Sequence, residues 1–217
     1  MPWPMVHFAI SDNLCSGNPT PSLLIGSIAP DAIHMRGSIT REEKGVTHLV
    51  QNDKLPAKEL IMIKFNEYLP QRSEPEWKEF ILGYFTHIYT DLRWTDTIYA
   101  DFERDYRGDQ IRGVYNQEVS QVEFDIQRSM KNYKDLMRML LKAKGYTIHP
   151  YVTQLEVSQY RDLKVEWLQD PHNEPHIKPI YFKSHIVNHF INETSKEIKD
   201  LLIDYDIEHF KEGRNIS

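Results

Sequence analysis

Apolar residues recur at intervals of three and four along most of the chain, which is the period of an α-helix with one buried face. The clearest run lies within residues 77–92, and its apolar members are Trp77, Phe80, Ile81, Tyr84, Phe85, Ile88 and Leu92. Ser73 offers an N-terminal cap and Pro75 suits a first helical turn. We expect this helix to continue to about Tyr106.

Six further segments show a helical pattern, and polar or proline-rich stretches separate them. The charged run from Gly37 to Gly45 is bounded by glycines and predicts an exposed loop. No segment alternates as a strand does, and no internal repeat occurs. We therefore expect an all-α fold of seven or eight helices in one domain spanning residues 1–217. The six segments are residues 5–14, 21–28, 56–69, 116–144, 153–168 and 181–206.

Composition narrows the classes of protein. Hydrophobic residues make up 40% of the 217 residues and aromatic residues 12%, which suffices for a well-filled core. A net charge of −6 lacks the basic footprint of a general nucleic-acid binder. Cys15 is the only cysteine, so no disulfide can form within the chain. With no signal-peptide pattern and no long apolar run, we expect a cytoplasmic protein.

His87 and Asp91 lie four residues apart in the clearest helix, on the face that carries Phe80 and Tyr84. Both side chains should therefore point into the core. A buried carboxylate requires a partner, and imidazole with carboxylate suits zinc. A hydrogen bond between His87 and Asp91 that closes the core is the simpler interpretation of the same spacing.

Other polar residues lie near segments that the pattern buries. His7 lies within an apolar segment, where a histidine with satisfied hydrogen bonds is the plainer interpretation. Asp31 follows the second segment and either caps a helix or binds a ligand. His34 lies three residues further on, and His48 follows the charged run. Neither position alone distinguishes a ligand from a surface side chain.

The last predicted helix carries His185, His189 and Glu193 at intervals of four, which places them in one stripe. Two histidines at this spacing can chelate one metal ion. A solvated polar face explains the stripe equally well. Several imidazoles and carboxylates on separate segments, without cysteine ligands, favour a hydrolytic metal centre over a structural zinc site.

The first 95 residues resemble the zinc-dependent phospholipase C family, which shares its all-helical fold with the fungal and plant zinc nucleases. The resemblance is carried by Gly26-Ser27-Ile28-Ala29-Pro30-Asp31, by His48, and by Gly83-Tyr84-Phe85-Thr86-His87 with Asp91. In that family an N-terminal His, an Asp after a Pro, a mid-chain His and a helical His-x-x-x-Asp bind a compact zinc cluster. The resemblance therefore implies zinc ligation by His7, Asp31, His48, His87 and Asp91.

Two positions depart from the family pattern. Secreted members begin, after processing, with a Trp that binds metal, whereas Trp3 is not the first residue here. The family also has a His soon after the helical Asp, where this chain has Thr97, and then a His-x-x-x-Glu pair. We expect His189 with Glu193 to provide that pair and His185 to replace the missing His. The expected cofactor is one to three zinc ions, and other divalent metals suit the same side chains.

The resemblance implies hydrolysis of a phosphate ester, with a phospholipid head group or a nucleotide as the partner molecule. Asp31 would bind metal and orient or deprotonate the attacking water, and His34 or His185 would orient groups or protonate the leaving group. Two alternatives remain. One is a metal-binding domain of this fold with an incomplete catalytic set, acting in regulation or interaction. The other is a plain helical bundle whose histidines pair with carboxylates.

Overall fold

The computed structural model describes residues 2–204, and helices form all of their regular secondary structure. Two isolated β-bridges, Gln51 with Lys54 and Ile148 with Val152, occur in the same part of the chain. The expectation of an all-α fold is therefore confirmed. In chain order, the α-helices are α1 (Pro4–Leu14), α2 (Pro21–Gly26), α3 (Arg41–Thr47), α4 (Lys58–Tyr68), α5 (Pro75–Trp94), α6 (Ala100–Asp105), α7 (Ile111–Ser129), α8 (Tyr133–Lys142), α9 (Gln154–Gln169) and α10 (Ser184–Asp204).

Short segments of other helix types connect some of these elements. A π-helical segment, η3, joins α5 to α6 without a break, so the helix expected to end near Tyr106 is one continuous rod. π-helical turns are rare and are frequently found at functional sites. The four segments are η1 (Ala29–Arg36), η2 (Leu69–Gln71), η3 (Thr95–Tyr99) and η4 (Pro171–Asn173).

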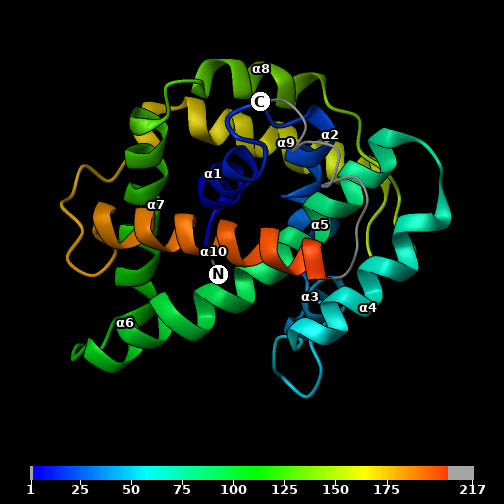
Figure 1. Cartoon of the computed structure of the whole chain (residues 1–217). Helices are drawn as coiled ribbons and strands as arrows, with labels where there is room; N and C mark the ends of the chain where they lie inside the picture. Colours follow the sequence, from blue (N-terminus) through cyan, green and yellow to red (C-terminus); the bar gives the residue numbers. More distant parts are fainter. Residues whose placement is uncertain (1, 205–217) are drawn as a thin grey trace.

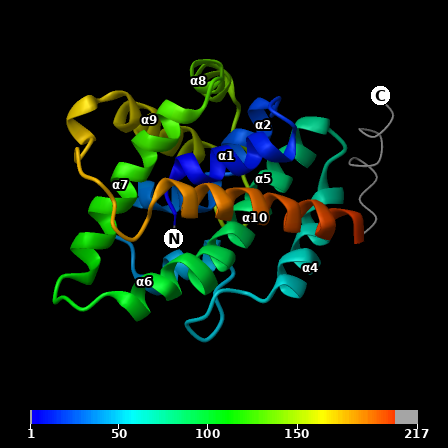
Figure 2. The ribbon, with the colours of Figure 1, turned by 60° about the vertical axis from the view of Figure 1, so that its left-hand side comes forward.

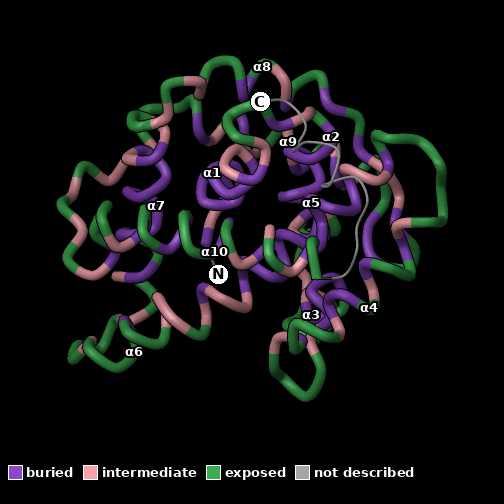
Figure 3. The backbone as a smooth tube through the Cα atoms, in the orientation of Figure 1, coloured by how far each residue is buried: buried purple, intermediate pink, exposed green. Residues whose placement is uncertain are grey.

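α1 lies in the middle of the molecule (Figure 1), with α10 running beside it (Figure 2). It packs against α2, α5, α7 and α10. Met5, Val6, Phe8 and Ile10 have no exposed surface, because the segment is apolar on every side. Figure 3 shows that buried positions concentrate in α1 and α5, whereas the outer helices carry exposed ones. The apolar sequence of α1 therefore carries His7 into the interior.

α2 packs directly against α5, backbone to backbone, through two glycines. A Cβ atom at Gly83 would lie 2.3 Å from the carbonyl oxygen of Leu23, and one at Gly26 would lie 2.3 Å from that of Phe80. Only glycine, which has no Cβ, permits so close an approach. This contact brings the residue after α2, Ser27, alongside the middle of α5.

The expected loop from Gly37 to Gly45 is wrong in its second half, because α3 begins at Arg41. The Thr40 side chain accepts a hydrogen bond from the Glu43 N–H, and the Glu43 carboxylate accepts one from the Thr40 N–H. This reciprocal pair is a capping box, which stabilises the start of a helix even in a charged sequence.

The expected helix over residues 116–144 is two helices, since the chain leaves the helical conformation at Met130 and α8 begins at Tyr133. This break and the unexpected α3 help to raise the number of α-helices within residues 2–204 to ten, above the expected seven or eight. In that same part of the chain, no helix combines the length and the apolar character needed to cross a membrane.

Candidate metal centre

Five of the site residues that the sequence suggested meet in the interior, and we call them the His/Asp cluster. His7 comes from α1, Asp31 from η1, His48 from the end of α3, and His87 and Asp91 from α5. The side chains of the three histidines and of Asp91 are at most 1% exposed, and that of Asp31 is 14% exposed. Four chain segments therefore bring five potential metal ligands into one buried volume.

The backbone of the segment that follows α2 orients the His87 side chain of α5. The Nδ1 atom of His87 lies 2.8 Å from the carbonyl oxygen of Ser27. A carbonyl oxygen only accepts, so Nδ1 carries the proton in this hydrogen bond. In the neutral imidazole, Nε2 then directs a lone pair into the cluster. Backbone carbonyls fix metal-binding histidines in this way.

His48 is oriented by the end of α3. Its Nδ1 atom lies 3.1 Å from the carbonyl oxygen of Lys44 and 2.9 Å from the Thr47 hydroxyl. By the same reasoning, Nδ1 donates to that carbonyl and Nε2 faces the cluster. The Tyr84 hydroxyl donates to the Thr47 carbonyl at 2.7 Å, which fastens the end of α3 to α5. Leu49, the residue after His48, has φ 57°, which turns the chain out of the helix.

The atoms that face one another have the spacing of metal ligands. Nε2 of His48 lies 3.3 Å from Nε2 of His87, and the two lie 3.4 and 3.5 Å from Oδ2 of Asp91. Asp31 places Oδ1 3.4 Å from Nε2 of His48 and Oδ2 4.0 Å from Nε2 of His87. Four ligands at about 2.1 Å around one tetrahedral zinc ion are about 3.4 Å apart. The separations of His48 and His87 from each other and from Asp91 therefore fit three ligands of one such ion, with Asp31 beside them.

His7 faces the other oxygen of the shared carboxylate. Its Nε2 atom lies 3.7 Å from Oδ1 of Asp91, and its ring stacks on that of His87 with the centroids 4.0 Å apart. Within the described residues, neither ring nitrogen of His7 and neither carboxylate oxygen of Asp91 has a hydrogen-bond partner. Leaving a buried polar group unsatisfied costs about 1–3 kcal/mol. A bound cation would satisfy the oxygens of Asp91 and the unprotonated ring nitrogen of His7.

Two overlapping sets of three residues have ligand atoms within 4.8 Å of one another: His7, His87 and Asp91, and Asp31, His48 and His87. His87 belongs to both, but its Nδ1 is bonded to Ser27, so Nε2 can serve only one ion. A second ion would have to rely on His7 and the outer oxygen of Asp91.

The charges of the cluster follow from burial and mutual contact. Burial, followed by the neighbouring His87, lowers the pKa of His7 to about 3, so this imidazole is neutral. Burial opposes ionisation of Asp31 and Asp91, yet Lys44 holds the pKa of Asp31 well below its ordinary value and His87 lowers that of Asp91. Burial also opposes protonation of His87, but Asp91 raises its pKa above the ordinary value. In the absence of a metal ion, a proton on His87 would supply the positive charge beside Asp91.

Asp31 connects the buried cluster to groups at the surface. Nζ of Lys44 lies 2.9 Å from Oδ1 of Asp31 and 3.3 Å from Nε2 of His34. The His34 side chain is 41% exposed, and its Nε2 lies 3.9 Å from the same carboxylate oxygen. The Tyr160 hydroxyl donates to the other oxygen at 3.5 Å. His34 is thus placed beside the cluster and not within it.

The structure does not bring the residues of the last helix to this cluster. His185, His189 and Glu193 are all exposed on α10. The buried side of that helix carries Val187, Phe190, Ile191, Thr194, Ser195, Ile198 and Leu202. The expectation that His185 and His189 add ligands is therefore replaced by its alternative, a solvated polar stripe.

The two positions that depart from the family pattern have structural roles. Trp3 occupies the position before the first turn of α1 and packs edge to face on Trp167, with ring centroids 5.3 Å apart. The Thr97 hydroxyl, in η3, donates to the carbonyl of Arg93, in α5, at 2.6 Å. Neither residue contacts the His/Asp cluster through a described hydrogen bond or ion pair.

Three polar residues on neighbouring elements were not predicted from the sequence. Lys44 contacts Asp31, Tyr160 donates to it, and Glu123 is a buried carboxylate that accepts from the Met5 N–H at 3.1 Å with each oxygen. Lys44 lies one helical turn before His48, so recognition of α3 would have placed it correctly. Glu123 and Tyr160 lie on α7 and α9 at positions with no local motif.

Comparison with known proteins gives no assignment. No family model matches the chain, no curated protein is similar to it, and no solved structure matches it.

Proposed function

We propose that this chain is a metal-dependent hydrolase of phosphate esters, with zinc as the ion best suited to its ligands. The proposal rests on one observation: the Nε2 atoms of His48 and His87 lie 3.3 Å apart, and each lies 3.4–4.0 Å from a carboxylate oxygen of Asp31 and of Asp91. Imidazole and carboxylate ligands without cysteine are typical of catalytic zinc, and other divalent metals accept the same set.

The roles of the remaining groups follow from their charges and exposure. A bound zinc ion supplies Lewis acidity toward a phosphoryl oxygen and toward water. The pKa of Asp31, held low by Lys44 against the effect of burial, makes it an acceptor that orients water and a weak base. Burial and Lys44 lower the pKa of His34, which is therefore neutral at pH 7 and able to take a proton. His34 is the group suited to proton exchange with the substrate.

A second candidate is a metal-binding helical domain with an incomplete catalytic set that acts in regulation or interaction. The observation that favours it is the lack of further ligands: Thr97 stands where the secreted enzymes have a histidine, and His185 and His189 are exposed. In this case the ion would stabilise the fold without turning over a substrate.

Metal content and hydrolysis, measured together, test both candidates. The protein is purified without a His tag, and its zinc is measured by atomic spectrometry before and after dialysis against a chelator. Hydrolysis of bis(4-nitrophenyl) phosphate is followed in the zinc-loaded wild type and in Asp31→Asn. We expect at least one zinc ion per chain, hydrolysis that chelation abolishes and zinc restores, and a large loss of kcat in the variant.

Bound zinc without hydrolysis of aryl, nucleotide and phospholipid esters would favour the non-catalytic domain. Absence of stoichiometric zinc or another divalent metal would overturn both candidates and leave a helical bundle whose histidines pair with carboxylates.

A further inference from the structure

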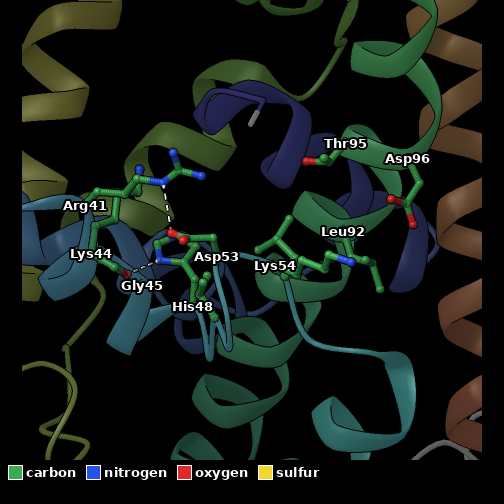
Figure 4. A pocket seen from close by; sticks show the side chains of 11 residues that line it. Arg41, Lys44, Gly45, His48, Asp53, Lys54, Leu92, Thr95 and Asp96 are labelled. Carbon is green, nitrogen blue, oxygen red and sulfur yellow. Dashed lines mark hydrogen bonds and ion pairs between the residues drawn. The ribbon is translucent and has the colours of Figure 1, made fainter.

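A cavity of about 490 Å³ opens between α3 and the end of α5. Figure 4 shows Arg41, Lys44 and His48 on one side of it and Leu92, Thr95 and Asp96 on the other, with Lys54 between them. This volume is typical of pockets that enclose a small molecule. We call it the α3–α5 cavity.

The α3–α5 cavity adjoins the His/Asp cluster through two residues. His48 lines the cavity, and its Nε2 atom lies 3.4 Å from both Asp31 and Asp91. Lys44 also lines it, and its ammonium group lies 2.9 Å from Asp31. A molecule in the cavity would therefore have the cluster at its inner end.

Three cationic side chains line the cavity, and they differ in whether an acidic side chain pairs with them. Arg41 pairs with Asp53 at 3.7 Å, but both side chains are more than 80% exposed, so the pair is weak. Lys44 is held by Asp31 at the inner end. Among the described residues, Lys54 makes no ion pair, although it follows a tight turn in which Asn52 and Asp53 both have positive φ. Lys54 is thus a cation presented on a constrained turn without a partner.

We infer that the α3–α5 cavity is the substrate pocket and that Lys44 and Lys54 bind the phosphate group of a soluble, anionic phosphate ester there. This inference rests on the proposed hydrolase function and adds to it the class of substrate and two positioning residues. Lysine binds phosphate as a point charge, and Lys44 places such a charge next to the cluster. The apolar side chain of Leu92 and its apolar neighbours are left to contact the alcohol part of the ester.

The lining favours a soluble ester over a lipid surface. Apart from Val46, the large exposed apolar side chains of the described chain lie on elements other than α3 and α5, and none of them lines the cavity. The mouth carries Arg41, Asp53 and Asp96, which are costly to bring into contact with hydrocarbon. A membrane-binding face would require a contiguous apolar patch at this mouth.

The test measures binding of inorganic phosphate by calorimetry to wild type, Lys44→Gln, Lys54→Gln and Lys142→Gln, each with its zinc content determined. Lys142 is exposed on α8, away from the cavity, and provides the matched loss of one charge. Charge-assisted contacts predict at least a tenfold rise in Kd for Lys44→Gln and about threefold for the more exposed Lys54→Gln. Lys142→Gln should stay within about twofold of wild type. A parallel titration compares glycerol 3-phosphate with phosphatidic acid vesicles.

Weaker phosphate binding in both pocket variants, at unchanged zinc content, supports the inference, as does preferential binding of glycerol 3-phosphate. Unchanged Kd values in both variants, or preferential binding to vesicles, overturn it. Loss of phosphate binding only in proportion to loss of zinc also overturns it, because the metal alone would then bind the anion. Phosphate binding in the pocket without hydrolysis of any ester would refute the hydrolase and retain the pocket. Hydrolysis with an unchanged KM in both variants would support the hydrolase and refute the assignment of this cavity as the substrate pocket.

Discussion

Replacing Asp91 by Asn distinguishes a metal ligand from a hydrogen-bond acceptor in the core. The Asp91 side chain is 0% exposed, and its Oδ2 atom lies 3.4 and 3.5 Å from the Nε2 atoms of His48 and His87. If it only accepts hydrogen bonds from protonated histidines, the amide keeps the shape and one acceptor. The loss is then about 1 kcal/mol, the difference between a charge-assisted and a neutral bond. If Asp91 is a ligand, the amide removes a charge that balances the metal, and affinity collapses.

The two interpretations predict losses of stability that differ in size and in their dependence on metal. A bound ion adds about 2.7 kcal/mol when free metal exceeds Kd a hundredfold. For a chain of this length, each kcal/mol corresponds to about 2–4 °C in Tm, so the metal adds roughly 5–10 °C. Without metal, a protonated His87 still pairs with the carboxylate of Asp91 in the wild type, whereas the variant keeps only a neutral hydrogen bond. In chelator, the Asp91→Asn variant should therefore be about 1 kcal/mol less stable than wild type.

The assay is thermal unfolding with zinc and with excess chelator, for wild type, Asp91→Asn and the control Asp101→Asn. Asp101 is an exposed carboxylate on α6 whose ion pair with Arg104 is 2.6 Å long. Chelation should lower the Tm of wild type and of the control by roughly 5–10 °C and that of Asp91→Asn by less than about 2 °C. Equal responses of wild type and Asp91→Asn, or none in either, would remove Asp91 from any metal site.

Three other predictions concern the surroundings of the cluster. Burial raises the pKa of Glu123 from its ordinary 4.5 to about 8, so the folded state keeps a proton that the unfolded state loses between these values. The free energy of unfolding of the wild type should then fall by up to roughly 5 kcal/mol as pH rises through this range. Urea unfolding at pH 5 and 8 measures this change, which should be much smaller in Glu123→Gln. An equal dependence on pH in wild type and variant would contradict the prediction. Gly83→Ala forces a Cβ atom into the backbone of α2 and should lower stability by about 2 kcal/mol and weaken zinc binding through His87, whereas unchanged Tm and affinity would contradict the packing argument. The double variant His185→Ala with His189→Ala should keep the zinc content and Tm of wild type, and a loss of zinc would return these residues to the site.

The sequence was sufficient for the helices whose apolar positions repeat over several turns. Residues 77–92 lie within α5, and Trp77, Phe80 and Ile88 are at most 1% exposed. α3 escaped prediction because its sequence is mostly charged and its start is defined by contacts between Thr40 and Glu43. That capping box was visible as Thr-x-x-Glu, but it was not followed by an apolar run. The break at Met130 has no glycine or proline to announce it.

For the candidate site, spacing alone was informative only where a buried face was already defined. His87 and Asp91 share a turn of a helix whose apolar face is unambiguous, and both are buried. His185 and His189 have the same spacing, yet the helix turns them to solvent because Val187 and Phe190 occupy the buried side. A separation of four residues states that two side chains share a face, and the neighbouring apolar residues determine which face is buried.

The motif that carried the family resemblance contains two glycines that are required for the close packing of α2 against α5. Gly26 and Gly83 are the two positions where α2 and α5 meet backbone to backbone, and a Cβ atom at either one would collide with the backbone of the other helix. That approach sets the carbonyl of Ser27 2.8 Å from Nδ1 of His87. The carbonyl in turn fixes the tautomer whose Nε2 lone pair faces Asp91. The glycines and the potential ligand therefore depend on each other in three dimensions, although the glycines are 57 positions apart in the sequence. This dependence explains why a change as small as one methyl group at Gly83 should reach the metal affinity of the cluster.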